Sequence, residues 1–316
     1  MKKLILSAAA CLMLFSCQND QTELTTDATN AITQRKCATQ DVLEAQLKAD
    51  PTLAIRMNQI EAFTQNALLT KRLVNGKVEI PVVVNVLYRT TAENISVTQI
   101  QSQIDVLNKD FNALNSDYNS VPSLFSGVKA NVGITFVLDQ IIRKSTTKTS
   151  WGTADAMKKA NRGGLAPTSP TTKLNLWVCT IGGGILGYAQ FPGGSSTTDG
   201  VAIDSKYVGL SGTANAPYNL GRTATHEVGH WMNLRHIWGD ANCGSDLVSD
   251  TPTHNDANYG VPIYPHYSTC TGTPVEMTMN YMDYTDDNAM YMFSTGQKSR
   301  MSAIFVSGGA RASFGV

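Results

Sequence analysis

Three histidines and one glutamate stand close together between His226 and His236. His226 and His230 are four residues apart, a spacing that puts both imidazoles on one face of an α-helix, one turn apart. Two imidazoles in that arrangement can share one Zn²⁺ at roughly 2.0–2.1 Å per bond. Glu227 follows His226 directly, so its carboxylate lies beside the pair, where it can act on water as a general base.

The third histidine, His236, requires a turn in the chain. A continuous helix would carry this residue away from the metal, so the chain must bend after about Met232. Asn233 stands at that point, and Asn tolerates the left-handed conformation better than other non-glycine residues. Three imidazoles leave one metal position open, which is typical of catalytic rather than structural zinc sites. The alternative is a helix whose three histidines are ordinary core or surface residues.

The order His-Glu-x-x-His-x-x-Asn-x-x-His, followed by Met282, resembles the metzincin metallopeptidases. The segments 226–231 and 280–284 are similar to the pappalysin branch of that family, particularly its bacterial members. Asn233 replaces the glycine of the general pattern and can make the same turn. The resemblance covers most of the chain after about Lys77 and implies a zinc endopeptidase. The alternatives are a zinc-bearing adhesin or binding module without activity, and an enzyme acting on a non-peptide amide.

The resemblance also implies roles for residues beyond the zinc helix. Met282 corresponds to the Met-turn, whose thioether packs beneath the imidazoles without binding the metal. Tyr284 corresponds to a tyrosine that can donate a hydrogen bond to the tetrahedral intermediate; the alternative is a packing or zinc-capping role. Asp286 and Asp287 lie at the expected wall of the pocket for the residue after the scissile bond, which would then favour Arg or Lys. The alternative for both is a plain surface acid.

A loop-rich stretch follows His236. Cys243 and Cys270 flank it, and in an exported protein they are the natural disulfide pair. Asp246, Asp250 and Thr251 offer hard oxygen ligands suited to Ca²⁺, and this stretch is similar to a calcium loop of the family. The alternative is a solvated acidic turn.

Residues 1–17 have the pattern of an export signal. Lys2 and Lys3 precede an apolar run that is short for a membrane span. The run ends at Cys17 and resembles a bacterial lipoprotein signal, in which Cys17 would be lipidated. The alternative is ordinary secretion with cleavage nearby. We therefore expect an exported protein whose only membrane contact is an N-terminal lipid.

Residues 18–72 are expected to form a pro-segment that begins with a polar tether. A helix is predicted from about residue 40 to 69, interrupted by Pro51, and Lys71-Arg72 offers a maturation site. Cys37 resembles the cysteine switch of related enzymes, in which a thiolate fills the open zinc position of the proenzyme. The alternative is a free or mixed-disulfide thiol in a flexible tail.

Residues 73–316 are expected to form the catalytic domain, of the α/β class. The predicted architecture is a twisted, mostly parallel sheet with a backing helix and the zinc helix above it, then an irregular lower half closed by a helix at about 295–306. The backing helix begins at Ser96, which with Gln99 has the pattern of a capping box. Strands are expected at residues 78–88, 132–138, 174–180, 185–191 and 201–204.

The edge of this sheet is a candidate substrate site. Gly187, Tyr188 and Ala189 could pair with a substrate backbone by strand addition, or form an ordinary strand. The chain has 25 basic and 25 acidic residues among 316, so its charge gives no argument for nucleic-acid binding. The expected partners are therefore protein or peptide substrates, and we expect a monomer.

Overall fold

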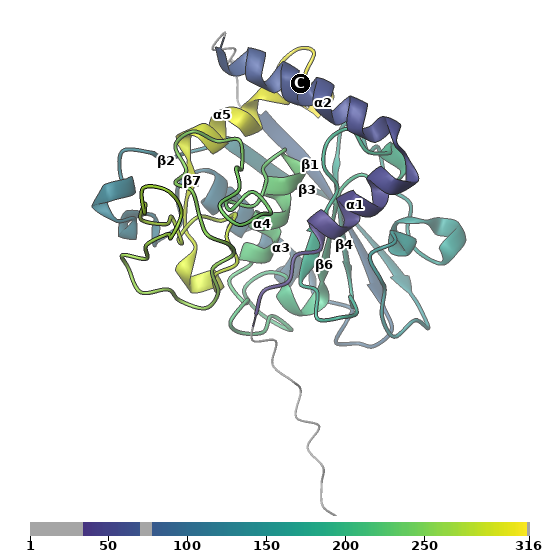
Figure 1. The fold of residues 1–316 in the computed structure, drawn as a ribbon. Coiled ribbons are helices and arrows are strands. Elements are labelled where there is room, and N and C mark those ends of the chain that lie inside the picture. The colour runs from purple at the N-terminus through teal and green to yellow at the C-terminus, as the bar shows by residue number, and fades with distance from the viewer. Residues whose placement is uncertain (1–33, 70–77, 315–316) are drawn as a thin grey trace, which may run out of the picture. The chain divides into compact units, whose positions relative to one another are not determined.

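The computed structural model describes residues 34–69 and 78–314 (Figure 1). The predicted export signal, with Cys17, and the predicted maturation site at Lys71-Arg72 lie outside the described residues. No helix of the described residues is long and apolar enough to cross a membrane.

A five-stranded sheet forms the centre of the fold, with strand order β3-β1-β4-β6-β5. The first four strands in that order are parallel to their neighbours, and β5 joins the edge antiparallel to β6. This is the mostly parallel sheet that the sequence predicts. In chain order the strands are β1 (Val78–Tyr88), β3 (Ile134–Ser145), β4 (Leu174–Cys179), β5 (Gly187–Ala189) and β6 (Val201–Asp204).

Both faces of the sheet are covered, as expected for parallel strands. Helices α3 (Val97–Phe111) and α4 (Arg222–Trp231) pack together on one face, where α3 contributes Ile100, Ile104 and Leu107 to the main core. The opposite face buries Trp177 and Tyr188 against a second cluster. Because α4 rests on β5 and β6, the predicted zinc helix is held directly above the edge strand.

The predicted pro-segment forms two helices, α1 (Thr39–Ala49) and α2 (Thr52–Leu69), which break at Pro51. Helix α1 contacts β5 at the edge of the sheet, and Figure 1 shows α2 beside α5 (Thr295–Ala303). A small sheet pairs β2 (Lys129–Ala130) with β7 (Phe293–Ser294). Short 3₁₀ turns lie at Tyr118–Ser120, Ser123–Phe125, Ala156–Lys158, Ala160–Arg162, Ser196–Thr198, Ser205–Tyr207, Asp287–Ala289 and Ala312–Phe314.

Local details differ from the sequence expectation. Ser96 caps α3 by accepting from the Gln99 N–H, but the Gln99 side chain bonds the Val208 carbonyl, so the predicted capping box is only half formed. The second predicted strand starts two residues late and extends to Ser145, because its whole length pairs with the long strand β1. These tertiary partners outweigh the local pattern.

Candidate metal centre and active site

Helix α4 and the turn after it bring three histidines together. His226 and His230 lie one turn apart on α4, which ends at Trp231. Asn233 then adopts the left-handed conformation, with φ of 74°, as the sequence predicts. The Leu234 N–H returns to the Gly229 carbonyl at 3.0 Å and closes the turn. The chain therefore reverses and presents His236 to the other two imidazoles.

The three Nε2 atoms converge on one point. His230 Nε2 lies 3.1 Å from His226 Nε2 and 3.0 Å from His236 Nε2. Each Nδ1 faces an oxygen. That of His226 lies 2.7 Å from the Tyr281 carbonyl, and that of His230 lies 2.8 Å from the Leu234 carbonyl. That of His236 lies 2.5 Å from the Asp240 carboxylate. With Nδ1 protonated, the Nε2 lone pairs face one another, an arrangement that a cation stabilises. Tetrahedral zinc ligands lie about 3.3 Å apart, so the donor set fits zinc.

The imidazoles are held in the neutral form that binds metals. Burial, together with the nearby His236, lowers the pKa of His230 to about 3. Burial and the other two imidazoles hold the pKa of His226 well below its ordinary value. Neutral imidazole is the ligand form, so no proton has to be released when a metal binds.

A methionine lies beneath this cluster. Met282 is fully buried, and its Sδ occupies the space where a Cβ at Gly229 would stand, at 2.5 Å. Any larger residue at position 229 would collide with the thioether. Met282 therefore packs against the predicted zinc helix at Gly229.

Glu227 lies against the predicted pro-segment. Its Oε2 accepts hydrogen bonds from the Thr39 hydroxyl at 2.8 Å and the Cys37 thiol at 3.3 Å. Burial raises the pKa of Glu227 to about 7, although the two hydrogen bonds oppose that rise. The ligand atoms of Cys37 and the three histidines all lie within 4.8 Å of one another, and among the described residues they form the one such group able to hold a metal.

The predicted pro-segment also pairs with the edge strand. The Leu186 N–H donates to the Lys36 carbonyl at 2.9 Å, and the Ala38 N–H donates to the Gly187 carbonyl at 3.0 Å. These bonds make a parallel bridge between Cys37 and Gly187. A Cβ at Gly187 would meet Glu227 Cγ at 3.1 Å, so the glycine lets β5 lie against the glutamate. The predicted substrate strand is thus covered by the chain's own N-terminal segment.

Arg35, two residues before Cys37 in the chain, is buried and ion-paired. Its Nη2 lies 2.6 Å from Asp287 Oδ1, and both side chains are at most 1% exposed. Its Nε donates to the Thr285 carbonyl at 3.2 Å, and the guanidinium lies 4.8 Å from the centre of the Tyr218 ring. Asp286 is half-buried and makes no ion pair with Arg35. Of the two predicted pocket acids, Asp287 therefore binds the basic side chain.

Tyr284 points to the backbone at the metal cluster. Its hydroxyl donates to the Cys37 carbonyl at 3.1 Å, and its ring lies 5.7 Å from the His226 ring. The hydroxyl keeps its proton, because burial and the nearby Cys37 and Glu227 hold the pKa of Tyr284 well above its ordinary value. A carbonyl oxygen next to the three histidines can thus receive a hydrogen bond from this residue.

Comparison with known proteins identifies the fold and the site together. Residues 178–306 match the family model described as pregnancy-associated plasma protein-A. An extracellular metalloprotease of Pyricularia oryzae is 33% identical over 285 residues, covering 86% of this chain and 89% of that protein. Extracellular metalloprotease 1 of Coccidioides posadasii is 34% identical over 263 residues, covering 78% and 84%. This chain belongs to the pappalysin family of metallopeptidases.

Solved structures support the same assignment for this pappalysin. Mature mirolysin of Tannerella forsythia, in complex with a cleaved peptide, is 42% identical, with a TM-score of 0.74, covering 77% of this chain and 97% of that one. A promirolysin mutant of the same organism is 39% identical, with a TM-score of 0.81, covering 89% and 97%. The predicted metzincin fold is therefore confirmed. This pappalysin is a metalloendopeptidase, and its structure is that of a latent, promirolysin-like form.

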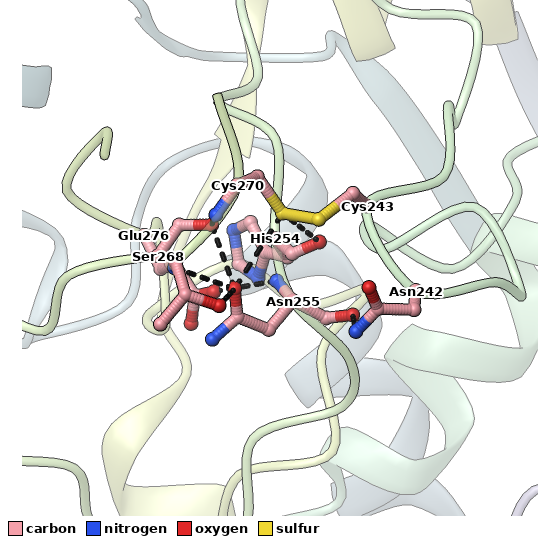
Figure 2. Close-up of a disulfide and its surroundings, with 8 residues drawn as sticks. Asn242, Cys243, His254, Asn255, Ser268, Cys270 and Glu276 are labelled. Atoms are coloured by element: carbon pink, nitrogen blue, oxygen red, sulfur yellow. Dashed lines mark hydrogen bonds between the residues drawn. A yellow bond between two sulfur atoms is a disulfide. The ribbon is translucent and has the colours of Figure 1, made fainter. Parts of the chain in front are cut away.

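The pappalysin's lower half carries the predicted disulfide, Cys243–Cys270, which joins residues 27 apart (Figure 2). Asn255 links the loops beside the disulfide by hydrogen bonds. Its carbonyl accepts from the Cys243 N–H, and its Oδ1 accepts from Ser268 Oγ at 2.9 Å. The Asn255 N–H donates to Glu276 at 2.7 Å. Long loops are thus held by one covalent link and a polar network. Cys179, a buried free thiol in β4, takes no part.

The predicted calcium residues divide into two groups. Asp246 is buried, and its carboxylate accepts from the Thr251 hydroxyl at 2.9 and 3.0 Å. Asp250 instead accepts from Ser294 Oγ at 2.6 Å and from the Gly296 N–H at 2.7 Å, at the start of α5. The two carboxylates therefore have different partners.

Several site residues have no signal in the sequence pattern. Asp240 orients His236 from four residues away, but an Asp in an irregular loop has no distinctive spacing. Arg35, Thr39 and Arg300 act through partners that are far away in the chain. His254 is fully buried, and its Nε2 accepts from the Met277 N–H at 3.0 Å.

Proposed function

We propose that this pappalysin is an exported, zinc-dependent endopeptidase that cuts peptide bonds before Arg or Lys and is made as a latent proenzyme. The observation that carries the proposal is the buried ion pair between Arg35 and Asp287. A pocket beside the metal cluster that already holds one guanidinium, with a carboxylate at its base, is suited to a basic substrate side chain. Lys would reach the same carboxylate as a point charge.

His226, His230 and His236 would hold the zinc ion, which supplies Lewis-acid chemistry to water and to the substrate carbonyl. Glu227 does the proton work. In the latent form its Oε2 accepts from Thr39 and Cys37, so this oxygen becomes a free acceptor when the pro-segment leaves. Glu227 then takes a proton from the attacking water and delivers it to the leaving amine. The Tyr284 hydroxyl, which bonds the Cys37 carbonyl in the latent form, would donate to the substrate oxygen as negative charge develops.

Latency would follow from the same contacts. With a cation on the imidazoles, the Cys37 sulfur would bind as a thiolate and occupy the position of the attacking water. Residues 1–17 would direct export, with Cys17 as a candidate lipid anchor, and residues 18–72 would form the pro-segment. Two facts support this division. Among the solved structures that match, a mature form covers 77% of the chain and a pro form covers 89%. Cleavage near Lys71-Arg72 would release the segment.

We also propose calcium binding, but with fewer of the predicted ligands. Asp246 and Thr251 lie together, whereas Asp250 caps α5, so the sequence-derived ligand set is only partly assembled. Burial raises the pKa of the Asp246 carboxyl to about 6, a cost that a bound Ca²⁺ would remove.

A peptide library tests the proposal. Zinc-loaded full-length protein, after proteolytic processing, should cut before Arg and Lys, and a chelator should abolish cleavage. Asp287→Asn should lower kcat/KM for Arg peptides by at least about tenfold, because a charge-assisted contact is lost. Asp286→Asn is the matched control and should change little. An unchanged preference in Asp287→Asn would refute the pocket, and failure to cleave any peptide would refute the activity.

A further inference from the structure

A second buried ion pair joins the pro-segment to the catalytic part. Arg300, on α5, is 2% exposed. Its Nη1 and Nη2 donate to the two carboxylate oxygens of Glu61 at 2.9 and 2.5 Å, and its Nε donates to the Asn233 carbonyl at 2.8 Å. Glu61 belongs to α2, within the proposed pro-segment. Loss of that segment would remove both hydrogen bonds to Glu61 and keep the one to the Asn233 carbonyl.

The other acids near Arg300 already have partners. Asp246 lies within electrostatic reach, because Arg300 opposes the rise of its pKa, but its carboxylate accepts from the Thr251 hydroxyl. Arg235 lines the same cavity and adds a second positive charge, which helps Arg300 to lower the pKa of Glu61 against the effect of burial. Asp240 also lines the cavity, but its carboxylate is bonded to His236 Nδ1. Once Glu61 has left, the two parallel N–H groups of Arg300 that bound its carboxylate would be free to bind another carboxylate.

The cavity lies beside the metal cluster. It has a volume of about 390 Å³ between the pro-segment helices and a wall that includes Phe191, Asn233 and Arg300. The Phe191 ring lies 5.6 Å from the His230 ring. From Arg35 in the Asp287 pocket, the pro-segment passes the histidines at Cys37 and then lines this cavity through α1. The cavity and the Asp287 pocket are therefore on opposite sides of the metal cluster along that path.

We propose that Arg300, assisted by Arg235, forms a subsite of the mature enzyme that binds an acidic side chain of the substrate on the amino-terminal side of the scissile bond. In the proenzyme Glu61 occupies this subsite. The inference rests on the proposed function, because it assigns the Asp287 pocket to the residue after the scissile bond. The preferred substrate would then carry an acidic residue before the scissile bond, bound by Arg300, and a basic residue after it, bound by Asp287.

The test uses the zinc-loaded full-length chain after processing. Fluorogenic peptides carry Arg after the scissile bond and a single Glu moved through the preceding positions, each paired with a Gln peptide. At one position, Glu should raise kcat/KM about tenfold over Gln, as expected for a charge-assisted hydrogen bond. In Arg300→Gln that ratio should fall to about one, whereas Arg300→Lys should retain part of it. A peptide with Lys at the same position should be a poor substrate of the parent enzyme.

The ratio separates recognition from structure. Arg300 also supports the Asn233 turn, so a purely structural defect would lower kcat/KM for the Glu and Gln peptides equally and leave their ratio unchanged. If the variants do not fold, the parent enzyme alone still tests the subsite. Equal kcat/KM values for the Glu and Gln peptides at every position would overturn it. Cleavage before Arg with no acid preference would refute this inference alone. Absence of cleavage in every peptide would refute the proposed function.

Discussion

Thr39 provides a test of how the pro-segment keeps the enzyme silent. Its side chain is fully buried; the hydroxyl donates to Glu227 Oε2 at 2.8 Å and accepts from the Ala189 N–H at 2.9 Å. It therefore engages both the proposed base and the edge strand. Thr39→Val keeps the shape of the side chain but removes one of the two hydrogen bonds to Glu227 Oε2 and leaves the Ala189 N–H without a partner while the pro-segment is docked. Both groups regain water when it leaves.

The size of the effect follows from these two contacts. A hydrogen bond to a charged group contributes about 1.5–3 kcal/mol, so docking of the pro-segment should weaken by about 2 kcal/mol. That energy corresponds to a roughly thirtyfold larger population of the open form. The assay is peptide hydrolysis by full-length, zinc-loaded protein in which Arg72→Ala blocks processing. Thr39→Val should show about thirtyfold more basal activity than the parent, and Cys37→Ala should also be more active.

Thr64→Val is the matched control. Thr64 is another fully buried pro-segment threonine, but its hydroxyl donates at 2.8 Å to the Ile60 carbonyl of its own helix. This variant should remain as silent as the parent. Equal basal activity in Thr39→Val and Thr64→Val would refute the role of the Thr39 hydroxyl. Equal latency in Cys37→Ala and the parent would show that the segment blocks the cleft without its sulfur.

Three further outcomes are expected. Glu227→Ala should retain zinc, measured by elemental analysis, and lose nearly all turnover; zinc loss or retained activity would contradict its assignment as base. With a chelator of Ca²⁺ present, the raised pKa of Asp246 makes stability fall as pH rises from about 4 to about 6, because the folded state binds more protons than the unfolded state there. Added Ca²⁺ should remove that fall in the melting temperature, and so should Asp246→Asn. Identical curves of melting temperature against pH with and without Ca²⁺ would refute calcium binding at this carboxylate. Replacing Cys243 and Cys270 together by Ser should lower the free energy of unfolding by about 3 kcal/mol in denaturant titrations, since the closed loop spans 27 residues; an unchanged midpoint would contradict this.

The core of the metal cluster is readable from the sequence because it is built from local geometry. The spacing of His226 and His230 is one helical turn, and Asn233 tolerates the left-handed φ that returns His236 to them. The parallel strands are also readable, because β1 and β4 are nearly continuous apolar runs buried on both faces. In these segments the local pattern and the tertiary environment favour the same structure.

Choices between neighbouring residues required the tertiary structure. Asp286 and Asp287 are equivalent in sequence, yet only Asp287 is buried and paired with Arg35. Asp246 and Asp250 look like ligands of one ion, but Asp250 is held at the start of α5. Which way each carboxylate points depends on the packing of elements that the local sequence does not describe.

The hydrogen bonds and ion pairs between the pro-segment and the catalytic part could not be predicted from the sequence. Arg35 meets Asp287 across 252 residues, Thr39 meets Glu227 across 188 and Glu61 meets Arg300 across 239. An ion pair or a hydrogen bond has no period along the chain, and any surface acid or base could be its partner before the fold is known. Burial turns these particular pairs into strong contacts, because the protein interior removes competing water, and burial is decided only when the distant segments pack together.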